Sequence, residues 1–532
     1  MDYLNTLTTH NTHIHNAVDL VRKFPVTQKL TDMYKRSSKN ELLFIGAATY
    51  IALYNFSAYI KEKRQKLNNP PAVPYGLPIF GHSLYLIFFP GKFMDWCNEK
   101  YGEMYNLNLR GKTVTVVGGK SGEESMKSDA TELSLSDAIV RDVLHLDYVF
   151  DENVLGHSLT TVPEVVKIAV TNSKMPMYVP GIKSGLKNAC DALLKEKTTV
   201  VQGPSRFFQN FVAYMTVPAF VGDEFALNVD VIESFAFFTG DIIKNVGTFM
   251  MIPKPLHKFV LPYVQSAKKH HDCMLKYIAP AVRERRAKMQ AAEEAGEEHG
   301  LVNDFLQGII EYIHIDENGV ESNISAEDIA HIVLLVAFAS VHTTSMNTSF
   351  CIYWLLARPD LMASLKEEME RVVPGDSPVT AEALAQMHFL NNFIRESIRQ
   401  GVDKLSKGRK AVKDYTFANG YQVPKGRLVS VASRQMNFGG NFVRNTIDGM
   451  DPEMSKNKPV TTPGRDFVSF GAGKHLCPGR FFAVQEIQMT LIYLLRNYDI
   501  TTVSGKPPKP VYSLAGYMST NSEEPLIFTR KN

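Results

Sequence analysis

The pattern of apolar and polar positions predicts a mainly α chain with a smaller β region. Residues 207–220 and 231–246 are rich in apolar side chains at helical spacing, and residues 257–286 continue this period while becoming more basic. Residues 112–118 (KTVTVVG) instead alternate and are β-branched, which is typical of a short strand. We therefore expect a helical body that carries a small sheet.

Two stretches of this body lack a clear period. Residues 287–300 (AKMQAAEEAGEEHG) are charged and of low complexity, and they predict a solvated linker between helices. Residues 249–252 lie next to Pro253 and Pro255 and predict an apolar loop. Such a loop can touch lipid, line a substrate entrance or pack in the core.

The longest predicted helix begins near Ser325 and ends just before Pro359. Ser325 and Asp328 resemble a capping box, and the residue before a proline disfavours helix. Small and hydroxylated residues interrupt the apolar middle of this helix, namely Ala339, Ser340, His342, Thr343, Thr344 and Ser345. Taken alone, such a cluster is more often a helix-packing notch than a functional site.

An uncharged stretch of 19 residues, 42–60, precedes the body. At 1.5 Å per residue it can cross a hydrocarbon core of about 30 Å. Basic residues flank it on both sides, which favours a membrane span over the alternative of a buried core helix. Because four basic residues lie within 15 positions on each side, the positive-inside rule leaves its orientation open. The predicted parts are an N-terminal extension (residues 1–41), a transmembrane anchor (42–60), a basic and Pro-rich connector (61–81) and a folded domain (82–532).

Charge and cysteine usage exclude several classes of protein. Lys and Arg number 58 against 55 acidic residues, so the net charge of +3 gives no reason to expect nucleic acid or another polyanion as a partner. The five cysteines are odd in number and show no CxxC spacing, which argues against a disulfide framework and a zinc site and favours a reducing compartment.

Cys477 differs from the other four cysteines in its surroundings. Gly471 and Gly473 before it permit a tight turn, and Pro478 after it is a favoured first residue of a helix. A sulfur at a helix start faces unpaired N–H groups and the positive end of the helix dipole. Both favour thiolate over thiol.

The run FGAGKHLCPG, residues 470–479, resembles the haem-ligand signature of the cytochrome P450 family, in which the cysteine is the proximal iron ligand. The resemblance assigns Cys477 to the iron. It assigns the neighbouring motif positions to the haem pocket, namely Phe470, Gly471, Gly473, His475 and Gly479. Glu396 and Arg399 resemble the family's ExxR pair on a helix that buttresses the haem, and Arg409 resembles an arginine that meets a haem propionate.

The middle of the long helix resembles the family's distal helix over the iron. The resemblance makes Thr343 the hydroxyl on the oxygen side, with His342 and Thr344 beside it as further catalytic candidates. His342 stands where the family usually has Asp or Glu. It either relays protons, since its reference pKa is about 6.5, or faces away and bonds a neighbouring helix. By their positions relative to the family, the residues expected to line the substrate pocket are Ala339, Thr343, Val402, Tyr517 and Met518.

Three departures from the family pattern concern the haem edge and the substrate channel. The Trp-x-x-x-Arg helix that grips a propionate is not visible between residues 155 and 195, where Lys167 is a weak stand-in. After Arg399, Gln400 begins a stretch that replaces the usual Leu-x-Pro. The segment before the haem loop is shortened, leaving Arg444 as the remnant of a buttressing arginine.

The resemblance covers residues 70–530 and implies a haem-thiolate monooxygenase of the microsomal, fungal type. It implies haem b as cofactor, O2 as oxidant and a hydrophobic small molecule, of steroid, sterol or terpenoid type, as substrate. Electrons are expected from NADPH through a separate reductase, with cytochrome b5 as a further partner, because no complete phosphate-loop or dinucleotide motif is present. The expected location is the endoplasmic reticulum membrane, with a single-pass anchor in the bilayer and a cytosolic haem-binding catalytic domain.

Two alternatives remain open. A haem-thiolate isomerase or dehydratase needs neither oxygen nor reductase, and the missing distal acid favours it. A haem-binding carrier or sensor without turnover is the more distant alternative.

Overall fold

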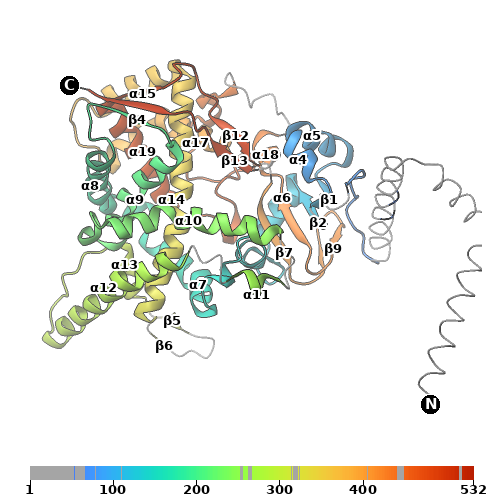
Figure 1. The fold of residues 1–532 in the computed structure, drawn as a ribbon, viewed down its shortest axis with the longest axis horizontal. Coiled ribbons are helices and arrows are strands. Elements are labelled where there is room, and N and C mark those ends of the chain that lie inside the picture. Colours follow the sequence, from blue (N-terminus) through green and yellow to red (C-terminus); the bar gives the residue numbers. More distant parts are fainter. Residues whose placement is uncertain are drawn as a thin grey trace, which may run out of the picture.

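The computed structural model describes residues 66–531 apart from 78–79, 110, 252–255, 262–266, 313, 316–320, 323, 404, 440–448 and 515–517, and before residue 66 it describes only Thr49 and Leu53. The N-terminal extension, Arg444 and, apart from these two residues, the expected anchor therefore lie outside the described residues. Figure 1 shows the described body as a mass of helices with the larger sheet at one side.

Helices make up most of the body, as predicted. They are α4 (Ser83–Phe88), α5 (Pro90–Tyr101), α6 (Gly119–Lys127), α7 (Glu152–Ala169), α8 (Met175–Leu193), α9 (Pro204–Val221), α10 (Val229–Met251), α11 (His257–Val260), α12 (Lys268–Ala295), α13 (Phe305–Ile310), α14 (Ala326–Ala357), α15 (Pro359–Val372), α16 (Ala381–Gln386), α17 (His388–Gly401), α18 (Ser433–Phe438) and α19 (Arg480–Asn497). The expected helices at residues 207–220 and 231–246 fall within α9 and α10.

The smaller β region is also confirmed. The larger sheet has the order β1-β2-β10-β7-β3, formed by β1 (Met104–Leu109), β2 (Lys112–Val117), β10 (Leu428–Val431), β7 (Ser406–Ala411) and β3 (Leu133–Ser134). A second sheet has the order β11-β14-β4, formed by β11 (Tyr498–Thr502), β14 (Leu526–Arg530) and β4 (Thr198–Val201). The remaining strands pair as β12 (Val511–Leu514) with β13 (Met518–Asn521), β5 (His314–Ile315) with β6 (Glu321–Ser322), and β8 (Tyr415–Thr416) with β9 (Gln422–Val423).

The Pro-rich segment expected to connect anchor and body is hydrogen-bonded to the larger sheet. Asn106 N donates to Pro71 O at 2.8 Å, and Val73 N donates to Asn106 O at 3.0 Å. Val73 is buried. This part of the expected connector therefore adds to the edge of the sheet at β1.

The long helix α14 runs through the core and packs against α9, α10, α12, α17 and α19 (Figure 1). Ser325 Oγ accepts a hydrogen bond from Asp328 N at 2.9 Å, and the helix ends at Ala357, ahead of Pro359, as predicted. Within the part of the chain that the structure describes, α14 is the one helix long and apolar enough to span a membrane, and 61% of its most apolar window is buried. Its apolar character therefore reflects its central place in the core.

Two local predictions are wrong. Phe249 is not in a loop, because α10 continues to Met251; its side chain is buried against the rings of Tyr148 and His257, which is the core-packing alternative. The expected linker is helical as far as Ala295, since α12 continues through good helix formers and ends where Gly296 adopts a left-handed conformation with φ +70°. Figure 1 shows this end of α12 projecting from the body.

Candidate active site

Cys477 lies at the end of a tight loop that leads into α19. Gly471 and Gly473 have φ values of +79° and +64°, and a Cβ on Gly473 would lie 3.0 Å from the Lys127 backbone, so both positions favour glycine. Cys477 N donates to Phe470 O at 2.8 Å. These contacts fix the position of the cysteine before the helix begins.

The helix after Cys477 begins at Arg480, two residues later than the predicted start at Pro478. Pro478 and Gly479 form a turn instead, and the backbone N–H groups of Gly479 and Arg480 point at the sulfur. Burial raises the pKa of the Cys477 thiol, while these N–H groups and the charges of Arg480 and Lys407 lower it by less. The helix start alone therefore does not make a thiolate here, whereas coordination to a metal deprotonates a thiol outright.

Arg409, on β7, is buried without a carboxylate partner. Its Nη1 donates to the carbonyls of Lys407 and Gly408 at 3.3 and 3.1 Å, and its Nε has no hydrogen-bond partner among the described residues. Burial lowers the pKa of the guanidinium to about 10. His475 Nε2 is also buried and unpartnered, and burial followed by the nearby Arg409 charge lowers its pKa. This side of the pocket thus presents unused donors.

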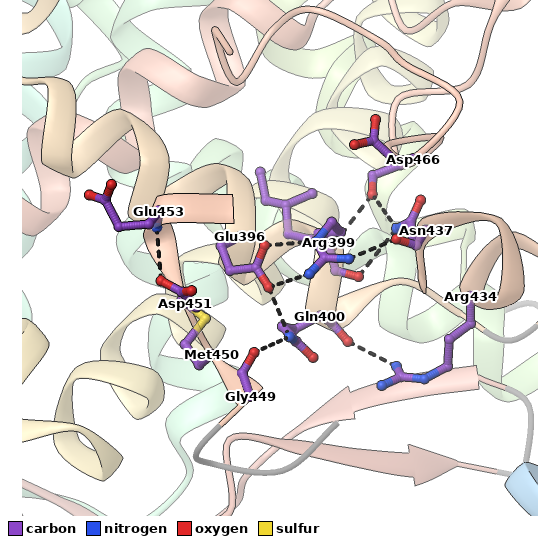
Figure 2. Close-up of polar contacts among 12 residues, drawn as sticks. Glu396, Arg399, Gln400, Arg434, Asn437, Gly449, Met450, Asp451, Glu453 and Asp466 are labelled. Atoms are coloured by element: carbon purple, nitrogen blue, oxygen red, sulfur yellow. Dashed lines mark hydrogen bonds and ion pairs between the residues drawn. The ribbon is translucent and has the colours of Figure 1, made fainter. Parts of the chain in front are cut away.

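Glu396 and Arg399, on α17, form a buried bidentate ion pair (Figure 2). Arg399 Nε and Nη2 each lie 2.7 Å from a carboxylate oxygen of Glu396, which is 0% exposed. Arg399 Nη1 donates to Asn437 O at 2.7 Å. The pair is therefore a fixed structural element and not the surface ion pair that this spacing usually forms.

Gln400 and Asn437 extend the pair into a network that the sequence did not suggest. The side-chain Nε2 of Gln400 donates to Glu396 Oε1 at 2.9 Å and to Gly449 O at 3.3 Å (Figure 2). The backbone carbonyl of Gln400 accepts from Arg434 Nη1 at 3.0 Å. Asn437 Oδ1 accepts from Val468 N at 2.9 Å. The network therefore joins α17 and α18 to the segment that enters the Cys477 loop.

The three hydroxyl and imidazole candidates on α14 face different ways. Thr343 is exposed, as is Ala339 one turn before it, and Thr343 Oγ1 donates to Ala339 O at 2.8 Å. Thr344 is buried, and its Oγ1 has no partner among the described residues. His342 Nδ1 lies 3.3 Å from Gln209 Nε2 on α9, and burial lowers its pKa. The histidine thus contacts a neighbouring helix, and Thr343 lies on the open face of α14.

The other pocket and propionate candidates are placed as follows. Val402 is buried, and its carbonyl accepts from Ser519 Oγ on β13 at 3.1 Å. Tyr517 and the side chain of Met518 lie outside the described residues. Lys167 is exposed and pairs with Glu164 at 2.7 Å, so it does not serve as a stand-in for the missing propionate arginine.

The sequence matches the family model for cytochrome P450 over residues 71–528. The chain belongs to the cytochrome P450 family. It is 26% identical to cytochrome P450 monooxygenase 151 of Postia placenta, over 78% of this chain and 84% of that protein. It is 24% identical to cytochrome P450 monooxygenase CYP512U6 of Ganoderma lucidum, over 76% and 79%, and 30% identical to cytochrome P450 monooxygenase olcJ of Penicillium canescens, over 57% and 58%.

Membership of the P450 family implies an oxidoreductase with a haem-thiolate cofactor and, in general, a reductase as redox partner. The residues around Cys477 fit such a group. Among the described residues no set of three or more His, Cys, Asp and Glu side chains could hold a metal ion, so a single thiolate suits a metal that arrives with its own macrocycle. The unpartnered nitrogens of Arg409 and His475 suit the propionates of that macrocycle.

Proposed function

We propose that this P450 is a membrane-anchored monooxygenase that inserts one oxygen atom from O2 into a hydrophobic small molecule of steroid, sterol or terpenoid type. Its electrons come from NADPH through a separate reductase, with cytochrome b5 as a second donor, and it acts at the endoplasmic reticulum membrane with its catalytic domain in the cytosol. The observation that carries the proposal is the Cys477 sulfur, faced by two backbone N–H groups, in a loop region where Arg409 and His475 each keep an unpartnered buried nitrogen.

Cys477 is the proposed iron ligand, and the loop around it holds the sulfur in place. Haem b, when bound, supplies O2 activation, which an electron-rich thiolate ligand favours. Phe470 O, Gly471 and Gly473 fix the loop backbone, while the N–H groups of Gly479 and Arg480 temper the charge on the sulfur. Glu396 and Arg399 act through Asn437, which hydrogen-bonds to Val468 in the segment that leads into this loop.

Thr343 is the proposed proton donor on the oxygen side, because its hydroxyl lies on the open face of α14. His342 bonds Gln209 on the neighbouring helix α9, which is the second of the two alternatives for this residue, and its proposed role is to fix the position of α14 behind Thr343. Because the amide nitrogen of Gln209 can only donate, Nδ1 of His342 accepts and the neutral ring carries its proton on Nε2. Burial lowers the pKa of the ring, so this neutral form persists at neutral pH. Thr344, which is buried, is assigned the supporting role of packing behind Thr343.

The test uses the full chain with reductase, NADPH and a panel of sterols and terpenoids under 18O2. We expect one substrate class to yield a hydroxylated product that carries one 18O atom and that requires both NADPH and reductase. A rearranged or dehydrated product formed without reductant and without label would instead indicate an isomerase or dehydratase. A haem spectrum with no product from any substrate would indicate a carrier or sensor.

A further inference from the structure

The P450 site lacks one expected cation at the haem edge. No Trp-x-x-x-Arg sequence is present between residues 155 and 195, where the family has that helix, and Lys167 is paired with Glu164 on the surface. Arg409 offers an unpartnered Nε for one propionate. A haem carries two negatively charged propionates, and His475 offers them only an unpartnered ring nitrogen, so a second cation near Arg409 would complete the balance of charge.

Lys407 has an unusual backbone on the strand that carries Arg409. Its φ is +54°, in the left-handed region that a residue with a Cβ seldom adopts. Such a conformation is unfavourable and tends to occur at functional sites. The neighbouring Gly408 is not the residue in this conformation, although a glycine could adopt it more easily.

The strain at Lys407 coincides with a β-bulge. Between β7 and β10, Val429 pairs with Arg409 and Val431 pairs with Ser406, so Lys407 and Gly408 together lie opposite a single residue. An extra residue in one strand changes the direction of the side chains beside it. The bulge thus directs Lys407 away from the course it would follow in a regular strand.

The Lys407 ammonium lies within electrostatic reach of Cys477 and Arg409. The half-buried side chain is close enough to Cys477, Arg409 and Asp403 for their charges to interact, and burial lowers its pKa. Yet the Lys407 ammonium makes no hydrogen bond or ion pair with another described residue, whereas Lys410 on the same strand pairs with Asp142 at 2.7 Å. A half-buried ammonium without an ion-pair partner is partly desolvated, so an anion bound beside it is favoured.

We propose that Lys407 binds a haem propionate and supplies the contact that the missing Trp-x-x-x-Arg helix makes elsewhere in the family. The proposal rests on Cys477 as the iron ligand. Its support is an ammonium without an ion pair, two residues from Arg409 and within electrostatic reach of Cys477, at a bulge that holds Lys407 in a left-handed backbone conformation. A charge-assisted hydrogen bond to the carboxylate satisfies the ammonium and anchors the haem edge.

The test compares purified holoenzyme with Lys407→Met, Lys407→Arg and the control Lys410→Met. The measurements are the rate of haem transfer to apomyoglobin, the haem reduction potential and the propionate bending bands in resonance Raman spectra. We expect Lys407→Met to lose haem about tenfold faster or more, as removal of a charged hydrogen bond implies, and to shift the potential to more negative values because an unpaired propionate favours ferric iron. Lys407→Arg should restore the rate, and Lys410→Met should match wild type.

Each outcome has a distinct meaning. Unchanged haem loss, potential and Raman bands in Lys407→Met would overturn the proposal and leave the ammonium to an anionic group of the substrate. Absence of a thiolate-type carbon-monoxide spectrum in wild type would instead overturn Cys477 as the ligand. If Lys407→Met does not fold, Lys407→Arg decides, since replacing ammonium by guanidinium moves the propionate bands only where this side chain contacts the propionate.

Discussion

At the scale of single residues, burial separates side chains that look alike in the sequence. Glu396–Arg399 and Glu164–Lys167 are both acid–base pairs three residues apart on helices. The first is buried and bidentate, and the second is exposed. Only the tertiary fold distinguishes the two pairs. The three-residue spacing allows the ion pair to form, whereas burial determines the free energy lost when one partner is removed.

We therefore predict that Glu396→Ala lowers the free energy of unfolding by about 3–5 kcal/mol, since it leaves Arg399 charged and buried. Glu164→Ala is the matched control and should leave stability almost unchanged. Urea unfolding of both variants measures the difference. Equal effects would mean that the Glu396 pair is as solvated as the surface pair.

Glu486, on α19, gives a prediction about pH. It is fully buried, its Oε1 accepts from Thr216 Oγ1 at 2.8 Å, and burial raises its pKa to about 8. The folded state therefore holds a proton that the unfolded state releases above a pKa of 4.5, so this group destabilises the fold as pH rises from about 5 to 8, by up to about 1.4 kcal/mol per pH unit.

Glu486→Gln should remove that loss. The variant should gain stability relative to wild type between pH 5.5 and 8, measured as the shift in urea midpoint at each pH. A constant difference between the two proteins across this range would contradict a protonated Glu486.

At the scale of elements, periodic apolar patterns predicted which helices exist but not always where they end. The cap at Ser325 and the proline at 359 framed α14 correctly. The charged end of α12 resembled a linker, because a solvated helix and a solvated loop share the same polarity. The start of α19 was placed two residues early, because Pro478 suits a turn as well as a first helical turn.

Sequence reasoning found those parts of the site that form local motifs, with residues close together in the chain. Glycine spacing predicted the tight loop at Cys477 that the structure shows, whereas the roles of Glu396, Arg399 and Arg409 at the haem stay predictions. Gln209, Asn437 and Lys407 were not found, because their roles depend on contacts between elements that are distant in sequence or on a bulge that no residue pattern announces.

The open face of α14 makes a prediction that separates two adjacent threonines. Thr343→Val should raise the hydrogen peroxide released per NADPH oxidised about tenfold or more, because a positioned proton donor is lost. Thr344→Val, at a buried position on the same helix, should leave this ratio near that of wild type. The reverse pattern would mean that the face of Thr343 is not the reacting face.

At the scale of the whole molecule, residues 42–60 are the proposed membrane anchor, and the described body is the catalytic domain. The body already has its central apolar helix in α14, and the Pro-rich segment joins it at β1. This arrangement leaves residues 42–60 as the proposed anchor.

Removal of residues 1–60 should therefore shift the protein from the membrane pellet to the detergent-free supernatant, or to a salt-extractable fraction. The truncated protein should keep its haem spectrum. If residues 42–60 were a core helix of the domain, the truncated chain would instead lose haem and aggregate.

The central claim is that the Cys477 thiolate binds the iron of a haem. The reduced, carbon-monoxide-bound absorption spectrum tests it most directly, with Cys273→Ser, a half-buried cysteine on α12, as the control. We expect wild type and Cys273→Ser to show the red-shifted band of thiolate-ligated haem and Cys477→Ser to lack it. A wild-type band at the position typical of histidine ligation, or an unchanged band in Cys477→Ser, would contradict the claim.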